Sequence, residues 1–101
     1  MTAILTDTTP LRGIPDKPLC NLDAEESILG AILLSPDAIS NVKDALRPEA
    51  FFFESHRTIY TCMLALHAQD ELPDLTQVST WLEDRQMLEK IGGIAKLVHL
   101  V

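Results

Sequence analysis

The sequence predicts an all-α fold, a compact orthogonal bundle of five to six short helices. Apolar side chains between residues 23 and 101 recur at helical spacing, and no stretch there alternates with the period of two that marks a strand. Prolines and glycines divide this segment into pieces of helical length joined by short connections. The chain has 101 residues, of which 47% are apolar, so it has the size and composition of one globular domain with one core.

The first 18 residues are predicted to form a flexible N-terminal tail ahead of a helical head at residues 19–101. Four helix-breaking residues interrupt any periodic pattern in this tail: Pro10, Gly13, Pro15 and Pro18. The segment lacks the positive start and the apolar run of a signal peptide, and the chain has no apolar run long enough to span a membrane. We therefore expect a cytoplasmic protein without membrane contact.

The first helix is predicted to begin at Asp23, a good N-cap, with Glu26 three residues later as its capping-box partner. Asp23, Glu25 and Glu26 form an acidic cluster at this helix start. The helix dipole favours negative charge there, so we interpret the cluster as structural rather than catalytic. Gly30 interrupts the apolar run that follows. It either permits close approach of another backbone or is a tolerated defect, and we favour the close approach.

The second helix is predicted to start at Ser35-Pro36, an N-cap followed by a proline in the first turn. It is expected to end at Arg47-Pro48, because the residue before a proline disfavours the helical backbone. This segment has the clearest amphipathic pattern in the chain, with an apolar stripe formed by Ala38, Ile39, Val42, Ala45 and Leu46. Phe51–Phe53 then form a short connecting turn.

The third helix is predicted at about residues 55–69. His56 and His67 both fall on its apolar arc. They are 11 residues apart, which is about 16 Å along a helix axis and too far for one metal ion. We expect both to be buried structural side chains.

The fourth helix is predicted to follow Asp74, its N-cap, with Gln77 as the capping-box partner. Gly92-Gly93 is expected to end a short helical turn and let the chain start a last helix. That helix is expected to carry its large apolar side chains on one side: Ile94, Leu97, Val98, Leu100 and Val101.

Charge and motif content argue against several classes of function. The 8 Lys and Arg against 15 Asp and Glu give a net charge of −7, which opposes sequence-independent binding of nucleic acid. Cys20 and Cys62 are expected to be two free thiols, with one disulfide as the alternative, and no Cys and His spacing suggests zinc. Gly92-Gly93 lacks the spacing of a phosphate loop. We predict no catalytic, cofactor-binding or metal-binding residues, and the residues alone indicate an acidic interaction module.

Five ordered segments of the chain resemble the N-terminal domain of bacterial replicative DNA helicases of the DnaB type. They are residues 23–36 (DAEESILGAILLSP), 46–52 (LRPEAFF), 56–60 (HRTIY), 73–76 (PDLT) and 88–93 (LEKIGG). The resemblance covers about residues 18–101. The chain departs from the family pattern at Ala50, where the family has an acidic residue, and at Lys96, where it has an aromatic one.

The resemblance implies a non-catalytic scaffold and protein-interaction domain. In the family, this domain contributes to the N-terminal collar of the hexameric helicase and to regulation of primase and loader docking in DNA replication. The family's nucleotide site lies in a later ATPase domain, which follows a hairpin and a linker. We therefore expect no enzyme activity and no ATP or Mg²⁺ in this chain. The expected partners are other subunits of the parent hexamer, primase and helicase loader, without direct nucleic-acid binding.

Two other functions stay open. One is the helicase-binding domain of a primase, which is a related helical fold. The other is a DNA-binding helical module, which needs a recognition helix with exposed basic side chains. It is less favoured, because the third helix has only Arg57 and the fourth only Arg85.

Phe53 is the residue for which we predict a contact with another protein. Three consecutive residues in a short turn cannot all face the core, and the family usually has a polar residue at the third position. We therefore expect Phe53 to be less buried than Phe51 or Phe52. Aromatic side chains are enriched at the centres of protein interfaces, so we expect Phe53 to touch a neighbouring molecule or a partner.

Overall fold

The computed structural model describes residues 21–101, and the predicted tail at residues 1–18 lies outside them. Five α-helices and three 3₁₀ turns follow in the order α1 (Leu22–Leu34), η2 (Pro36–Ala38), α2 (Ile39–Val42), η3 (Pro48–Ala50), α3 (Glu54–Ala68), α4 (Leu75–Asp84), η4 (Glu89–Ile91) and α5 (Gly93–Leu100). All of these elements are helical, which confirms the all-α prediction for the part of the chain that the structure describes.

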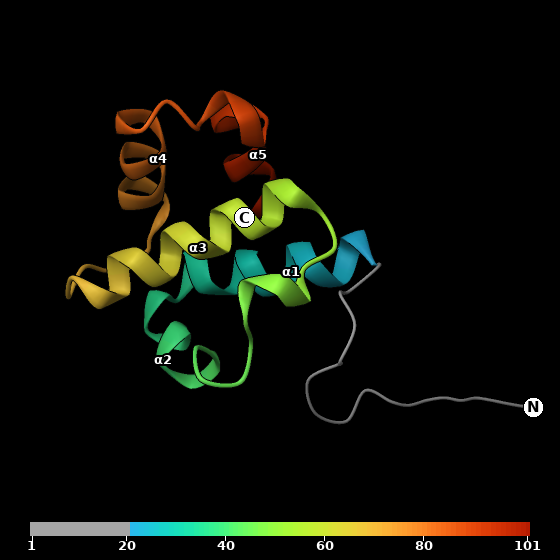
Figure 1. The fold of residues 1–101 in the computed structure, drawn as a ribbon, viewed down its shortest axis with the longest axis vertical. Coiled ribbons are helices and arrows are strands. Elements are labelled where there is room, and N and C mark those ends of the chain that lie inside the picture. Colours follow the sequence, from blue (N-terminus) through green and yellow to red (C-terminus); the bar gives the residue numbers. More distant parts are fainter. Residues whose placement is uncertain (1–20) are drawn as a thin grey trace, which may run out of the picture.

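The longest helix, α3, crosses the middle of the molecule (Figure 1). It contacts α1, α2 and η3 as well as α4 and η4, and Figure 1 shows α2 below it and α4 and α5 above it. Side chains from all these elements form one core. Its large members with no or almost no exposed surface are Leu29, Ile32, Ile39, Phe51, Ile59, Tyr60, Met63, Val78, Leu82 and Leu97.

The first helix begins two residues earlier than the capping pattern predicts. Asn21 is its N-cap, and the Asn21 side chain accepts a hydrogen bond from the Ala24 N–H at 3.0 Å. Asp23 lies exposed in the first turn, where it still complements the helix dipole. Glu26 is not a capping-box partner, because its carboxylate binds Lys96. Asparagine and aspartate cap about equally well, so only backbone geometry separates the two candidates.

The second helix is much shorter than its amphipathic pattern predicts. Regular α-helix ends at Val42, and a turn follows at residues 43–45. The Tyr60 hydroxyl donates a hydrogen bond to the Leu46 carbonyl at 2.7 Å, and Arg47 is extended (φ −100°, ψ 155°) ahead of Pro48. A tertiary contact from α3 and the constraint of the following proline therefore replace the last helical turn. Leu46 is buried as expected, but Ala45 is exposed.

Two local predictions in the C-terminal half are confirmed. Asp74 is the N-cap of α4 and accepts from the Gln77 N–H at 2.8 Å, although the Gln77 side chain donates to Glu71 rather than back to the cap. Gly92 and Gly93 both have left-handed backbones, with φ of 108° and 77°. A side chain at either position would be strained, so the pair turns the chain from η4 into α5.

Gly30 lies where the C-terminal end of α5 meets α1. A Cβ atom at this position would collide with the carbonyl of Leu100. This geometry confirms the close approach and excludes the tolerated-defect alternative. The absence of a side chain at residue 30 is therefore what lets the two backbones touch.

Candidate interaction surface

The three phenylalanines between η3 and α3 lie in three different environments. Phe51 is fully buried and packs against Tyr60 with ring centroids 5.2 Å apart. Phe52 is 51% exposed, whereas Phe53 is half-buried between Phe52 and His56. The prediction that Phe53 is the least buried of the three is therefore wrong. Phe52 faces outward, and Phe53 packs edge-on against the His56 ring, with ring centroids 5.4 Å apart.

The backbone N–H groups of this turn are held by a buried carboxylate. One oxygen of Glu25 accepts from the Phe52 N–H at 2.8 Å, and the other accepts from His56 Nδ1 at 2.7 Å and from the Phe53 N–H at 3.5 Å. Glu25 and His56 have no exposed surface. A buried carboxylate is stable only when its oxygens are hydrogen-bonded, and here three N–H groups supply those bonds.

The carbonyl groups of the same turn are held from α3. The Arg57 guanidinium donates from Nη1 to the Phe51 carbonyl and to the Phe52 carbonyl, both at 2.9 Å. Glu25 and Arg57 thus fix the donors and the acceptors of one short segment from two different helices. We call residues 51–53, with Glu25, His56 and Arg57, the clamped turn. These hydrogen bonds restrict the motion of the backbone that carries the exposed Phe52 ring.

The two histidines of α3 differ in burial. His56 is fully buried and structural, as predicted, and its Nδ1 is the atom that faces the Glu25 carboxylate. Its Nε2 atom has no hydrogen-bond partner among the described residues. His67, in the last turn of α3, is only half-buried, so the prediction holds for one histidine and fails in part for the other.

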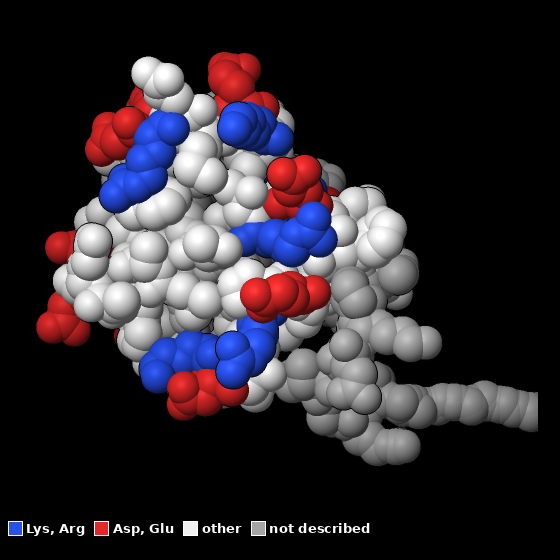
Figure 2. Space-filling view, viewed as in Figure 1, with Lys and Arg blue, Asp and Glu red and all other residues white. Residues whose placement is uncertain are grey.

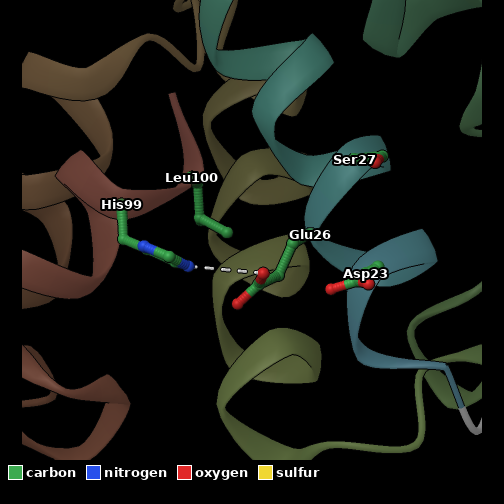
Figure 3. Close-up of a pocket in the computed structure, with 5 residues that line it drawn as sticks. All are labelled: Asp23, Glu26, Ser27, His99 and Leu100. Atoms are coloured by element: carbon green, nitrogen blue, oxygen red, sulfur yellow. Dashed lines mark ion pairs between the residues drawn. The ribbon is translucent and has the colours of Figure 1, made fainter.

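A second polar cluster joins α1 to α5 beside Gly30. Lys96 Nζ donates to one Glu26 oxygen at 2.8 Å, and His99 Nε2 lies 3.4 Å from the other. The hydrogen bond from Lys96 is the main cause that lowers the pKa of Glu26 below its usual 4.5. Figure 3 shows His99 reaching from α5 toward Glu26, with Asp23 one turn away along α1. These side chains, with Ser27 and Leu100, line a small cavity of about 260 Å³.

The last helix is apolar on two faces rather than one. Leu97 and Leu100 are buried, whereas Ile94, Val98 and Val101 are about half exposed. The exposed three are spaced four and three residues apart, so they form one stripe along α5. The expectation that all five apolar side chains share one face is therefore wrong, because α1 and α4 pack against α5 but leave Ile94, Val98 and Val101 exposed.

The described residues offer little for catalysis or metal binding. Among residues 21–101 no group of three or more His, Cys, Asp or Glu side chains is placed to hold a metal ion. Cys62 is buried without a disulfide, and burial raises the pKa of its thiol to about 12, so it is a poor nucleophile. Cys20 lies outside the described residues. No helix in the described part of the chain is long and apolar enough to cross a membrane.

Glu25 is the functional residue that sequence reasoning misread. The sequence pattern assigns it, with Asp23 and Glu26, to an acidic cluster that complements the helix dipole. Glu25 lies four and seven residues before Leu29 and Ile32, on the buried face of α1. Its helical spacing from Leu29 and Ile32 was the signal that could have identified Glu25 as a buried residue. The groups that bind it, 27 to 31 residues later, could not be identified from helical spacing.

Comparisons with known proteins agree with the resemblance seen in the sequence. The model of the family described as "DnaB-like helicase N terminal domain" matches residues 17–101. The chain is 47% identical over 87 residues to the replicative DNA helicase DnaB of Synechocystis sp., covering 86% of this chain and 10% of that protein. It is 36% identical over 100 residues to the replicative DNA helicase DnaC of Bacillus subtilis, covering 99% of this chain and 20% of that protein.

A solved structure shows the same fold. The crystal structure of the N-terminal domain of DnaB helicase from Mycobacterium tuberculosis superposes with a TM-score of 0.77 and 39% sequence identity, over 83% of this chain and 60% of that one. The chain spans only a tenth to a fifth of the length of the two curated relatives above, and the part that it matches is the N-terminal domain without the ATPase domain. The chain belongs to the family of DnaB-like helicase N-terminal domains.

Proposed function

We propose that the chain is a non-catalytic scaffold and protein-interaction domain of a replicative DNA helicase. In this role it contributes to the N-terminal collar of a hexamer and to the docking of primase and of a helicase loader during DNA replication. The observation that carries the proposal is the clamped turn, which holds an exposed aromatic side chain in a fixed place. The relatives are replicative DNA helicases, which agrees with a cytoplasmic location.

The exposure of Phe52 supports an interface rather than a purely structural role. Phe51 already fills the core at this turn, so Phe52 adds nothing to that packing. Single exposed apolar side chains are common, but the backbone of Phe52 is held by hydrogen bonds from two helices. A rigid aromatic side chain loses little conformational entropy on binding and makes a good interface anchor. Half-buried Phe53, packed edge-on against Phe52, is proposed to take part in the same contact.

The α5 stripe of Ile94, Val98 and Val101 is the second apolar surface that supports association with other proteins. Figure 2 shows one face of the molecule, on which Lys and Arg side chains lie beside Asp and Glu side chains and leave uncharged surface between them. This face has no continuous basic patch of the kind that phosphate contacts need. It therefore favours protein partners over the alternative of a DNA-binding module.

The proposal is tested by measuring self-association and partner binding of the 101-residue chain. Sedimentation and light scattering give its oligomeric state, and titration with purified primase and purified loader gives the affinity for each. We expect Phe52→Ser to weaken at least one of these associations by about tenfold or more, because anchor residues at interfaces typically contribute about 2 kcal/mol.

Leu72→Ser is the matched control. Leu72 is 54% exposed, close to the value for Phe52, but lies in the loop between α3 and α4. It should leave every association unchanged. If Phe52→Ser behaves like Leu72→Ser in all three measurements, the clamped turn is not an interface. Filter binding of DNA across a range of salt distinguishes the DNA-binding alternative, because a steep salt dependence would support it.

The helicase-binding domain of a primase was the less favoured alternative, and we do not propose it, since the family model that matches is that of the helicase. We propose no cofactor for this chain. ATP and Mg²⁺ are expected only in the ATPase domain of the parent enzyme.

A further inference from the structure

A cavity at the opposite end of α3 from the clamped turn has a composition that suggests a ligand. It has a volume of about 240 Å³ and lies between the last turn of α3, the loop that follows and α4. Trp81 and Arg85 line it from α4, and Glu71 lines it from the loop. It shares no residue with the clamped turn or the α5 stripe, so what it binds is independent of the function proposed above.

The Trp81 ring in this cavity already holds a cation. The Arg85 guanidinium lies over the ring, with Cζ 3.9 Å from the ring centroid, and its Nη1 donates to the Trp81 carbonyl at 3.3 Å. Arg85 is exposed and makes no ion pair with any residue that the structure describes. A cation–π contact at an exposed site is weak, so another cation can displace Arg85 from the ring.

Two carboxylates that line the same cavity as Trp81 lack a charged partner among the described residues. Glu71 and Asp84 both line the cavity, and neither forms an ion pair within residues 21–101. Glu71 accepts only a long hydrogen bond from the Gln77 side chain, at 3.4 Å. A cavity lined by an aromatic ring and two carboxylates matches the guanidinium group, which stacks on rings and donates in its plane to carboxylate oxygens.

We propose that this cavity binds an arginine side chain from a basic segment of a partner protein. The incoming guanidinium takes the place of Arg85 over Trp81 and pairs with Glu71 and Asp84. Arg85 occupies the ring when no partner is present, so it acts as an internal competitor. The net charge of −7 on the whole chain also favours a basic partner, because complementary charge speeds encounter and selects against acidic surfaces.

The single tryptophan of the chain makes the proposal directly measurable. Its indole N–H, which has no acceptor among the described residues, gives one indole resonance, and its fluorescence comes from this cavity alone. The probe is the capped peptide Gly-Arg-Gly-Arg-Gly, titrated into the 101-residue chain while both signals are recorded. The control peptide carries citrulline, which keeps the shape of arginine but has no charge. We expect the arginine peptide to move both signals with saturation and the citrulline peptide to leave them unchanged.

Two sets of variants then test the aromatic ring and the pair of carboxylates separately. Arg85→Ala should tighten peptide binding by about twofold to fivefold, because it removes the competitor from the ring. Its matched control is Arg47→Ala, which deletes the same charge at an exposed position in front of η3 and should change affinity little. The double variant Glu71→Gln/Asp84→Asn should weaken binding by about threefold to tenfold, whereas Asp37→Asn/Glu89→Gln, with the same loss of charge elsewhere on the surface, should not.

Three results would overturn the proposal. The first is that Trp81 does not respond to the arginine peptide in either the wild type or Arg85→Ala. The second is that the citrulline peptide binds equally well. The third is that the two double variants weaken binding equally, which would show a general attraction to an acidic protein. Circular dichroism of each variant checks that it is folded. If Arg85→Ala does not fold, the titration of the wild-type chain with the two peptides decides whether the cavity binds arginine.

Discussion

Glu25 and Glu26 are neighbours in α1, and the structure uses them in opposite ways. Glu25 points into the molecule, has no exposed surface and is held by three N–H groups of the clamped turn. Glu26 points to the edge of the molecule and pairs with Lys96 and His99 of α5. One residue of sequence, which is a rotation of about 100° around the helix, separates a fully buried anchor from a partly buried ion pair.

The difference shows that burial, rather than charge, decides how much a carboxylate contributes. The hydrogen bonds of Glu25 form out of reach of water, so removing the carboxylate leaves buried donors without an acceptor. The ion pair of Glu26 competes with water and is screened by salt. The α1–α5 corner must therefore depend mainly on the close packing of Gly30 against Leu100, with the ion pair as a small addition.

The largest effect is expected from Glu25→Gln. The amide keeps the shape of the side chain but turns one acceptor into a donor, which then faces the Phe53 N–H or His56 Nδ1. We expect a loss of about 3 kcal/mol in the free energy of unfolding, measured by urea denaturation. The matched substitution Glu26→Gln should cost less than about 1 kcal/mol. Equal losses for the two variants would contradict the conclusion that the buried Glu25 contributes more to stability than Glu26.

The second effect concerns Gly30. Gly30→Leu is expected to cost about 1–3 kcal/mol, because even its Cβ meets the Leu100 carbonyl and α5 must move away from α1. Thermal unfolding measures the loss. Gly93→Ala provides a contrast, since it introduces backbone strain at φ of 77° with nothing near its Cβ, whereas Gly30→Leu introduces a steric collision. An unchanged melting temperature for Gly30→Leu would show that the corner tolerates a side chain.

The sequence was sufficient for features that depend on local chemistry. The cap at Asp74, the turn at Gly92-Gly93, the third helix and the close approach at Gly30 follow from residue types and spacing, and the structure confirms them. The exposed face of α5 and the early end of α2 were not predictable in this way. The exposure of α5 depends on which other elements pack against that helix. The early end of α2 depends on the Tyr60 hydroxyl, which binds the Leu46 carbonyl from 14 residues further along the chain.

The clamped turn, too, could be predicted from the sequence only in part, because its geometry depends on tertiary contacts. The alternation of buried and exposed side chains correctly implied that one of the three phenylalanines faces outward. Which one does so depends on Glu25 and Arg57, whose hydrogen bonds set the backbone direction at the turn. Family resemblance gave the fold and the parent protein but pointed to Phe53, since a polar preference at one position does not fix the direction of its neighbours.

A third, smaller effect is a loss of stability at alkaline pH, which tests the buried and uncharged hydroxyl of Tyr60. Burial raises the pKa of Tyr60 from 10.0 to about 12, so the folded protein holds the phenolic proton more tightly than the unfolded chain. The resulting stabilisation is complete below pH 10 and is lost as the pH rises toward 12. Tyr60 alone should account for about 1 kcal/mol between pH 10 and pH 11.

Urea denaturation at several pH values between 9 and 11 measures this loss. Cys62, whose thiol pKa is also raised to about 12, acts in the same direction, so the comparison is made in a Cys62→Ala background. Tyr60→Phe in that background should flatten the alkaline slope. It should also lower stability at neutral pH by about 1 kcal/mol, since the hydrogen bond to the Leu46 carbonyl is lost. A slope that persists in Tyr60→Phe would contradict the assignment.

The smallest effect is expected from Lys96→Met. Because Lys96 lowers the pKa of Glu26, their pairing stabilises the fold above the usual carboxyl pKa of 4.5 and is lost as the pH falls below it. The variant should lose less than about 1 kcal/mol at pH 7, and the difference from wild type should shrink in high salt and at pH 3. Lys43→Met, which removes an exposed pair with Asp44, provides the surface reference. A loss larger than that of Gly30→Leu would reverse the order of contributions at this corner.

The hydrogen bonds of Glu25 also determine how the surface of this protein exchanges with water. Phe52 shows half of its side chain to solvent, but its amide is bonded to a carboxylate that can be released only when α1 separates from the start of α3. Amides in surface turns ordinarily exchange their hydrogens through local fluctuations, whereas this one is tied to the opening of the core. We therefore expect this exposed aromatic residue to carry a slowly exchanging amide, so that the direction in which its backbone presents the ring persists for as long as the core stays closed.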